Sequence, residues 1–308
     1  MTGRIIARLL QGVVVIWVIY TVTFALVIVM PGNPFERTDG RAISPVIERA
    51  LRQRYGMANN REFYVNYLLG MGRLDFGESL HYRDWTCNQI IAESLPVSVA
   101  LGTWALLVAL VFGVLFGTLG AVYRYRLIDY ATLSIAIVGI SVPSFVVGAG
   151  LLIVFGIMLA WAPVGGWGTL SHIWLPGAAL SLPYMAYIAR LTRLGMLDVL
   201  SSDYVRTARA KGCAPPVVIG KHALKNAFLP VLSFLGPAAA AVLTGSFVVE
   251  KVFNIPGLGT HFVQSVLNKD QMLILAVVIV YSGVIVVFNL AVDIAYGWFD
   301  PRIGTEGS

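Results

Sequence analysis

Six long runs of apolar residues constrain this chain more than any other feature of its sequence. A helix of about 20 residues is long enough to cross the hydrocarbon core of a bilayer. Only 12% of the residues are charged, against about 25% in an average soluble domain. The sequence therefore predicts an all-α, polytopic membrane protein with six transmembrane helices, over about residues 9–30, 97–122, 132–160, 173–193, 228–249 and 272–298.

The first run follows Arg4 and Arg8, a pattern that signal peptides and retained membrane helices share. The apolar region of a cleaved signal peptide is about 7–15 residues long and is followed by a small-residue cleavage site. The run here is longer, and no clear site of that kind precedes Pro31. We therefore predict a retained first helix within residues 1–30, with a cleaved signal peptide as the alternative.

Basic residues are distributed unevenly among the short loops. They gather at the N-terminus, at 123–130 and at 201–230, whereas loop 161–172 has none. Since cytoplasmic loops carry the excess of Lys and Arg, both termini are predicted to be cytoplasmic. The net charge of +6 is then an orientation signal rather than a nucleic-acid footprint. Cys87 and Cys213 fall on opposite sides, so no disulfide is predicted between them.

The stretch 201–230 must lie in water, although apolar runs flank it. It reads SSDYVRTARAKGCAPPVVIGKHALKNAFLP and contains five Lys or Arg residues. Inserting one such residue at the centre of a bilayer costs about 2.5–3.5 kcal/mol, so five would cost about 12–18 kcal/mol. The first half of the stretch predicts a helix over 203–212.

That helix carries its own start and stop signals. The Ser-Ser-Asp run at 201–203 can cap the first turn with a side-chain oxygen. Lys211 suits the negative end of the helix dipole, and Gly212 suits a left-handed cap. The Pro-Pro pair at 215–216 then prevents the helix from continuing. Three residues are predicted to share one face by their spacing: Tyr204, Val205 and Ala208.

The same stretch carries a family resemblance. RTARAKG, nine residues and then HALKNAFLP resemble the cytoplasmic "EAA" loop of ABC-importer permeases, in the form found in the oligopeptide/dipeptide/nickel permease family. In that family the loop forms a coupling helix that docks into a groove on the ATP-binding subunit. The general pattern has Glu six residues before the Gly. This chain has Arg206 there, followed by Thr207 and Ala208, which we interpret as the peptide-permease variant.

Weaker motifs extend the resemblance over nearly the whole chain: PGNPF, LDFGES, VPSF, IPGLG and DPR. The chain most resembles the oligopeptide/dipeptide "B" permease type. The resemblance implies an ABC importer type I-like permease fold in four parts: a first helix with a cytoplasmic N-terminus at 1–30, an extracytoplasmic segment at 31–94, a five-helix core at 95–300 that contains the coupling loop 195–227, and a cytoplasmic tail at 301–308.

Segment 31–94 has mixed charge, and its aromatic and apolar residues predict short amphipathic helices. One interpretation is a solvated loop without a partner. The other, which follows from the resemblance, is part of the docking surface for an extracytoplasmic substrate-binding protein. The sequence leaves both interpretations open.

The resemblance implies a permease subunit of the bacterial inner membrane that moves oligopeptides or dipeptides by alternating access. Nickel or another small solute is the alternative substrate, and a secondary transporter or channel is the alternative class. The expected partners are a second, homologous permease in a heterodimer, two ATP-binding subunits or domains that hold ATP and Mg, the binding protein and the lipid bilayer. The expected contacts with the ATPase are Asp203, Tyr204, Val205, Arg206, Thr207, Ala208, Arg209, Ala210, Lys211, Gly212 and His222.

Signals of catalysis are absent from the sequence. It contains no GxxxxGK[ST] phosphate loop, no GxSxG elbow and no HExxH motif. An intramembrane hydrolase would need a nucleophile and a base within the spans, and no such pair is evident. We therefore predict a non-catalytic chain that binds no cofactor, metal or nucleic acid, and the sequence assigns no residue to a translocation pathway.

Three charged residues lie in or at the ends of the predicted spans. Asp293 is an acid within the last run, so it is either functional or paired at the interface, with Arg302 as the expected partner. Arg190 and Arg193 end the fourth run and are expected to extend toward the cytoplasmic interface.

Two features bear on the shape of the spans. Pro143 and Pro183 each remove a hydrogen bond and can kink their helices. Gly113, Gly117 and Gly120 recur on one face of the second run, which predicts a small-residue seam for close helix packing.

Overall fold

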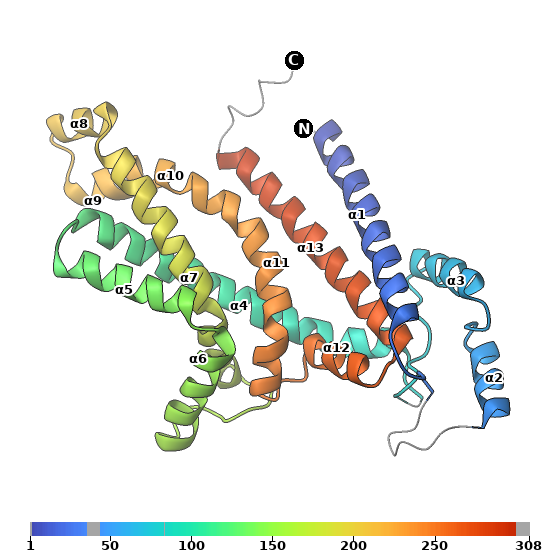
Figure 1. Cartoon of the computed structure of the whole chain (residues 1–308). Coiled ribbons are helices and arrows are strands. Elements are labelled where there is room, and N and C mark those ends of the chain that lie inside the picture. The colour runs from blue at the N-terminus through green and yellow to red at the C-terminus, as the bar shows by residue number, and fades with distance from the viewer. Residues whose placement is uncertain (1, 36–43, 83, 300–308) are drawn as a thin grey trace. The chain divides into compact units, whose positions relative to one another are not determined.

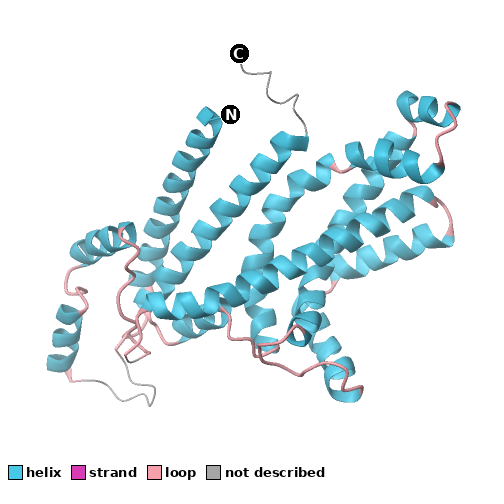
Figure 2. Cartoon of the chain, turned by 180° about the vertical axis from the view of Figure 1, so that it is seen from behind, coloured by secondary structure: helices cyan, strands magenta, loops and turns pink. Residues whose placement is uncertain are grey.

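The computed structural model describes residues 2–35, 44–82 and 84–299. The regular elements among these residues are helices, apart from one isolated bridge between Glu78 and Thr86 (Figures 1 and 2). The all-α architecture predicted from the apolar runs is therefore confirmed for the described part of the chain.

The chain divides into two compact units, and α4 (Cys87–Val122) and α13 (Gln271–Phe299) contribute to both. The predicted coupling loop belongs to the first unit, so this unit positions the candidate site. Among the described residues, the units are composed of Val99–Ile255 with 287–299, and of Thr2–Ser98 with Pro256–Val286.

Helix α7 (Ser171–Leu200) is the central helix of the first unit and contacts α5, α6, α10 and α11. Its buried face includes small and polar residues such as Gly177, Ser181 and Thr192. Neighbouring helices rather than lipid cover these residues, so α7 does not need a uniformly apolar surface. These neighbours are α5 (Leu127–Ser141), α6 (Ser144–Leu151), α10 (Leu224–Ala227) and α11 (Leu229–Val252), and α6 continues into the π-helix η1 (Leu152–Met158).

The third predicted run is broken at Pro143. Helices α5 and α6 meet there at a bend of 106°. Val142 has an extended backbone, with φ −96° and ψ 125°, because a residue before proline is disfavoured in the helical region. The predicted run 132–160 therefore consists of two helical segments rather than one straight helix, and the kink that Pro143 made possible is present. Pro183, by contrast, lies inside the continuous α7.

The glycines of α4 allow close approach to neighbouring helices. A Cβ atom at Gly113 would lie 2.7 Å from Cγ2 of Ile188, and one at Gly117 would lie 2.6 Å from Cβ of Thr192. Both partner residues belong to α7. Gly120, one turn further along, faces the start of α5. The predicted small-residue seam is confirmed, and its main partner is α7.

Four described helices are long and apolar enough to cross a membrane, and α5 with α6 and η1 gives a fifth candidate if the bent pair is one span. Helix α7, which covers the fourth predicted run, is not apolar enough to be counted among them. Helix α4 begins earlier than the predicted residue 97. The four candidate spans are Ile6–Val29, Cys87–Val122, Leu229–Val252 and Gln271–Ile294.

In the second unit, aromatic residues join α1 to α3. The rings of Tyr20 and Tyr67 stack with centroids 5.9 Å apart, and those of Phe24 and Phe63 lie 5.2 Å apart. Short helices predicted within 31–94 are thus present, and α3 packs its aromatic face on the first apolar helix. The helices confined to this unit are α1 (Thr2–Val29), α2 (Pro45–Arg54), α3 (Asn60–Gly72) and α12 (Leu258–Leu267).

A buried carboxylate fixes the LDFGES segment to the start of α13. Asp270 is fully buried and accepts hydrogen bonds from the Ser79 hydroxyl and from the His81 N–H, the latter at 3.2 Å. It also accepts from the N–H of Leu273 at 3.1 Å and so caps the first turn of α13. Segments nearly two hundred residues apart in the sequence are therefore held together by one side chain.

Candidate functional site

The helix predicted over 203–212 is present as α8 (Asp203–Ala210), which ends at Ala210 rather than at residue 212. Only Ser201 and Ser202 separate it from α7. Because α7 continues to Leu200, it includes the first part of the predicted loop 195–227. Figure 1 shows α8 beyond the end of α7.

The start of α8 differs from the prediction. Ser202 has the extended backbone of an N-cap, but its hydroxyl donates to the carbonyl of Val199 at 2.6 Å. The Ser201 hydroxyl likewise donates to the carbonyl of Asp198 at 2.8 Å. The predicted side-chain cap is therefore wrong, because both hydroxyls bond back to the last turn of α7. Asp203 lies in the first turn of α8, where its negative charge favours the positive end of the dipole.

The end of α8 follows the prediction closely. Gly212 has a left-handed backbone, with φ +77°, and its N–H donates to the carbonyl of Arg209 at 2.9 Å. The N–H of Cys213 donates to the carbonyl of Ala208 at 3.2 Å. These two bonds form the Schellman pattern that satisfies the last carbonyls of a helix. Lys211 is the C-cap residue, just beyond the last turn in which it was expected.

Two prolines begin the next helical segment. Pro215 and Pro216 occupy the first positions of α9 (Pro215–Val217), where a missing N–H costs nothing. The chain continues through the π-helix η2 (Val218–Ala223) into α10. His222 lies in η2 and is half-buried.

The predicted apolar face of α8 points inward. Val205 is fully buried and Ala208 is 7% exposed, whereas Tyr204 is 43% exposed. The Tyr204 hydroxyl accepts a hydrogen bond from the Asn226 side chain at 2.8 Å. The buried pair therefore attaches α8 to its own chain and is not part of the exposed surface. Its packing partners are Val199, Leu200, Cys213 and Val218.

The outer surface of α8 is mainly polar. Arg206 and Asp203 form an exposed ion pair at 3.4 Å, a kind of contact worth only about 0–1 kcal/mol. Breaking this ion pair so that Arg206 or Asp203 can contact another protein would therefore cost little free energy. The exposed residues of α8 and its cap are Asp203, Tyr204, Arg206, Thr207, Arg209, Ala210, Lys211 and Gly212.

A cavity of about 270 Å³ lies beside α8. Its lining is apolar apart from one cation and one thiol. A side chain with an apolar body and a terminal acceptor would match this lining. The residues around the cavity are Val122, Leu200, Arg209, Cys213, Pro215, Val218 and Ile219.

A buried ion pair joins the start of α5 to α7. Arg193 donates to both carboxylate oxygens of Asp129, at 2.7 and 2.9 Å. Arg193 is thus paired and largely buried, while Arg190 one turn earlier is exposed. The expectation that both residues extend toward the cytoplasmic interface stays a prediction. Asp129 lies in the predicted turn 123–130, and nothing in the local sequence indicates a partner 64 residues away.

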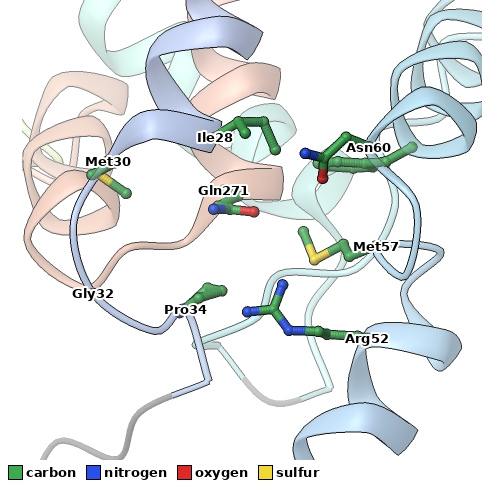
Figure 3. Close-up of a pocket in the computed structure, with 9 residues that line it drawn as sticks. Ile28, Met30, Gly32, Pro34, Arg52, Met57, Asn60 and Gln271 are labelled. Atoms are coloured by element: carbon green, nitrogen blue, oxygen red, sulfur yellow. The ribbon is translucent and has the colours of Figure 1, made fainter.

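A second cavity, of about 200 Å³, lies in the other unit between the end of α1 and the α2–α3 connection (Figure 3). The side chains of Arg52, Asn60 and Gln271 point toward it in Figure 3, and Met57 forms part of its wall. The Arg52 Nε donates to Glu48 at 2.9 Å, so this cation is already paired. The cavity belongs to the segment for which a binding-protein surface is one of the two predictions.

Other candidate residues are dispersed. Among the described residues, no group of three or more His, Cys, Asp or Glu side chains could hold a metal ion. Asp293 is exposed on α13, and its expected partner Arg302 lies outside the described residues, as does the DPR motif.

The comparison with known families rests on most of the chain. Residues 98–305 match the family model described as "binding-protein-dependent transport system inner membrane component". The chain belongs to this family. It is a non-catalytic permease subunit of an ABC transporter and a multi-pass protein of the inner membrane. The family resemblance seen in the coupling loop is thereby confirmed. Membership also implies ATPase and binding-protein partners.

Curated relatives match this permease over nearly its full length. It is 40% identical over 304 residues to the oligopeptide transport system permease protein OppB of Haemophilus influenzae, covering 97% of this chain and 98% of the relative. The dipeptide transport system permease protein DppB of Bacillus subtilis is 40% identical over 304 residues, covering 98% of each chain. OppB of Salmonella typhimurium is 40% identical over 302 residues, covering 97% and 98%.

Proposed function

We propose that this permease is the B-type membrane subunit of an ATP-driven importer of oligopeptides or dipeptides. Full-length identity of 40% to permeases named for oligopeptide and dipeptide transport carries the proposal. It is supported by α8, a short capped helix whose exposed surface is polar and whose buried side is tied to α7.

In this proposal α8 is the contact with an ATP-binding subunit. Arg206, Arg209 and Lys211 are the polar anchors, and Tyr204 with the cavity beside Arg209 receives apolar side chains of the ATPase. The buried Val205 and Ala208 act indirectly, by holding α8 against the end of α7. Gly212 sets the direction in which the chain leaves the helix. His222 is a contact at the edge of this surface.

The proposed topology has six crossings with both termini in the cytoplasm. Helix α7 has 30 residues, and at about 1.5 Å per residue it is longer than the hydrocarbon core, about 30 Å thick. Its burial among other helices explains its modest apolarity. Helices α5 and α6 with η1 count as one bent span. With six such crossings, α8 lies in the cytoplasm and segment 31–94 lies outside. In this proposal the segment contributes to the docking surface for the binding protein.

The proposed mechanism is alternating access. The importer contains a second, homologous permease and two ATP-binding subunits or domains, which hold ATP and Mg. Closure of the ATPase pair displaces α8, and α7 carries this displacement into the membrane helices. The central pathway then opens outward to receive the peptide from the binding protein. Hydrolysis of ATP resets the inward-facing state.

Reconstitution tests this proposal. The permease is purified with its partner permease and ATPases, placed in proteoliposomes and supplied with the binding protein. Peptide-loaded binding protein should stimulate ATP hydrolysis and drive ATP-dependent peptide uptake. Stimulation by nickel but not by peptides would assign the alternative substrate. Uptake driven by an ion gradient without ATP would overturn the importer proposal.

A further inference from the structure

The buried ion pair between Asp129 and Arg193 is the feature of the first unit that the transport proposal does not yet use. Asp129 is 2% exposed and Arg193 is 17% exposed. Both guanidinium contacts are short, and Asp129 also accepts a hydrogen bond from the N–H of Tyr125 at 3.0 Å. Because two nitrogens of Arg193 contact the two oxygens of Asp129, the pairing fixes the orientation of the two side chains as well as the distance between them, which a single hydrogen bond does not.

The pair fixes a tight turn between α4 and α5. Tyr125 in this turn has a left-handed backbone, with φ +63°, a conformation that is unfavourable for a bulky residue. The carboxylate of Asp129 holds that residue through its N–H. Gly120 makes room for the arrangement, because a Cβ atom there would lie 3.4 Å from both Asp129 Oδ1 and Arg193 Cδ. Three helices, α4, α5 and α7, therefore converge on one ion pair.

The same arginine lies close to the start of the coupling helix. Arg193 is seven residues before the end of α7 at Leu200, which is about 10 Å at helical rise. Beyond that end, Val205 of α8 packs on Val199 and Leu200. Helix α7 contacts α5 and approaches α4 at Gly113 and Gly117, and Figure 1 shows α8 at the end of α7. A displacement of α8 would therefore reach Arg193 through the contact of Val205 with Val199 and Leu200 and then through the last two turns of α7.

We propose that the Asp129–Arg193 ion pair is a positioning element that makes the α4–α5 turn, α7 and α8 move as one body during transport. This inference rests on the proposed function. Without the pair, α7 could rotate relative to α4 about their small-residue contact. Part of the displacement of α8 would then be lost before it reached α4 and α5. A buried ion pair often contributes little net stability relative to an apolar replacement, and in some proteins its role is instead to specify one arrangement of its neighbours.

The test uses the complete transporter in proteoliposomes and measures peptide uptake and ATP hydrolysis in the same sample. The variants are the neutral pair Asp129→Asn with Arg193→Gln, the single Arg193→Lys, which keeps the charge but loses the planar two-point contact, and the swap Asp129→Arg with Arg193→Asp. Arg190→Gln, an exposed arginine one turn away, is the matched control. Co-purification of the ATPases reports assembly.

We expect the neutral pair and Arg193→Lys to retain ATPase binding and ATP hydrolysis stimulated by the binding protein. Their uptake per ATP should fall about five-fold or more, the lower end of ordinary coupling between sites. The charge swap should recover part of the loss, and Arg190→Gln should match the wild type. Wild-type uptake per ATP in the neutral pair would overturn the inference, and so would failure of that variant to assemble, which would make the pair a folding element.

Failure of the proposed function gives a different result in the same experiment. In that case the wild-type transporter itself would show no peptide uptake and no stimulated hydrolysis. The positioning role is judged only by the ratio of the two rates in a wild type that transports, so the two failures are distinguishable.

Discussion

Gly212 shows how much of the candidate site depends on a single backbone conformation. Its φ of +77° lies in the left-handed region, and its N–H completes the pattern that ends α8. An added Cβ atom would meet nothing within 4 Å. Any effect of a side chain at this position therefore comes from backbone strain rather than from collision.

At this scale we predict that Gly212→Val blocks transport while assembly remains largely intact. A β-branched residue held in the left-handed region costs about 1–3 kcal/mol, so the end of α8 should change direction. Peptide uptake and co-purification of the ATPases in the same membranes check this prediction. Gly212→Asn is the control, since Asn tolerates this conformation better and should retain most of the uptake. Normal uptake by Gly212→Val would count against α8 as a mechanical contact.

At the scale of elements, α4 and α7 can approach closely because the glycines of α4 that face α7 have no side chains. A Cβ atom at Gly117 would meet the carbonyl oxygen of Ala189 and would lie 2.6 Å from Cβ of Thr192. The first of these atoms is backbone, so the neighbour cannot move aside by changing a rotamer. The spacing of the glycines predicts the seam, and only the structure identifies α7 as the helix on the other side.

Gly117→Ala should therefore separate α4 from α7 and lower the stability of the permease by about 1–3 kcal/mol, as overpacking usually does. Thermal unfolding of the detergent-solubilised protein measures the change. Gly150→Ala in α6 is the matched control, because nothing lies within 4 Å of its added Cβ atom. Equal melting temperatures for the two variants would contradict the close approach of the helices.

For the whole molecule, the orientation in the membrane decides whether α8 can meet an ATPase at all. Four or five candidate spans are present among the described residues, and six crossings with cytoplasmic termini follow only if α7 is also counted. The distribution of basic residues supports that count, since 123–130 and 201–230 then lie on the same side as the N-terminus.

The two cysteines and one added thiol test this orientation. Cys87 is fully buried, so it should react from neither side, while Cys213 is half-buried just beyond the end of α8. A membrane-impermeant maleimide should label Cys213 in inverted vesicles but not in intact spheroplasts. Val46→Cys, at a position of α2 that is 74% exposed, should show the opposite pattern. Labelling of Cys213 in intact spheroplasts would overturn the proposed topology.

The sequence by itself determined the helical membrane class, the family and the local form of α8, including its left-handed glycine end. These features depend on runs of apolar residues and on neighbours a few positions apart, which are visible without a fold. Only the tertiary structure decided that Val205 and Ala208 face inward, that the hydroxyls of Ser201 and Ser202 do not cap α8, that α5 turns by 106° into α6, and that Arg193 pairs with Asp129. Each of these results depends on which distant segment lies opposite, because packing and buried charge are satisfied by neighbours in space rather than in sequence.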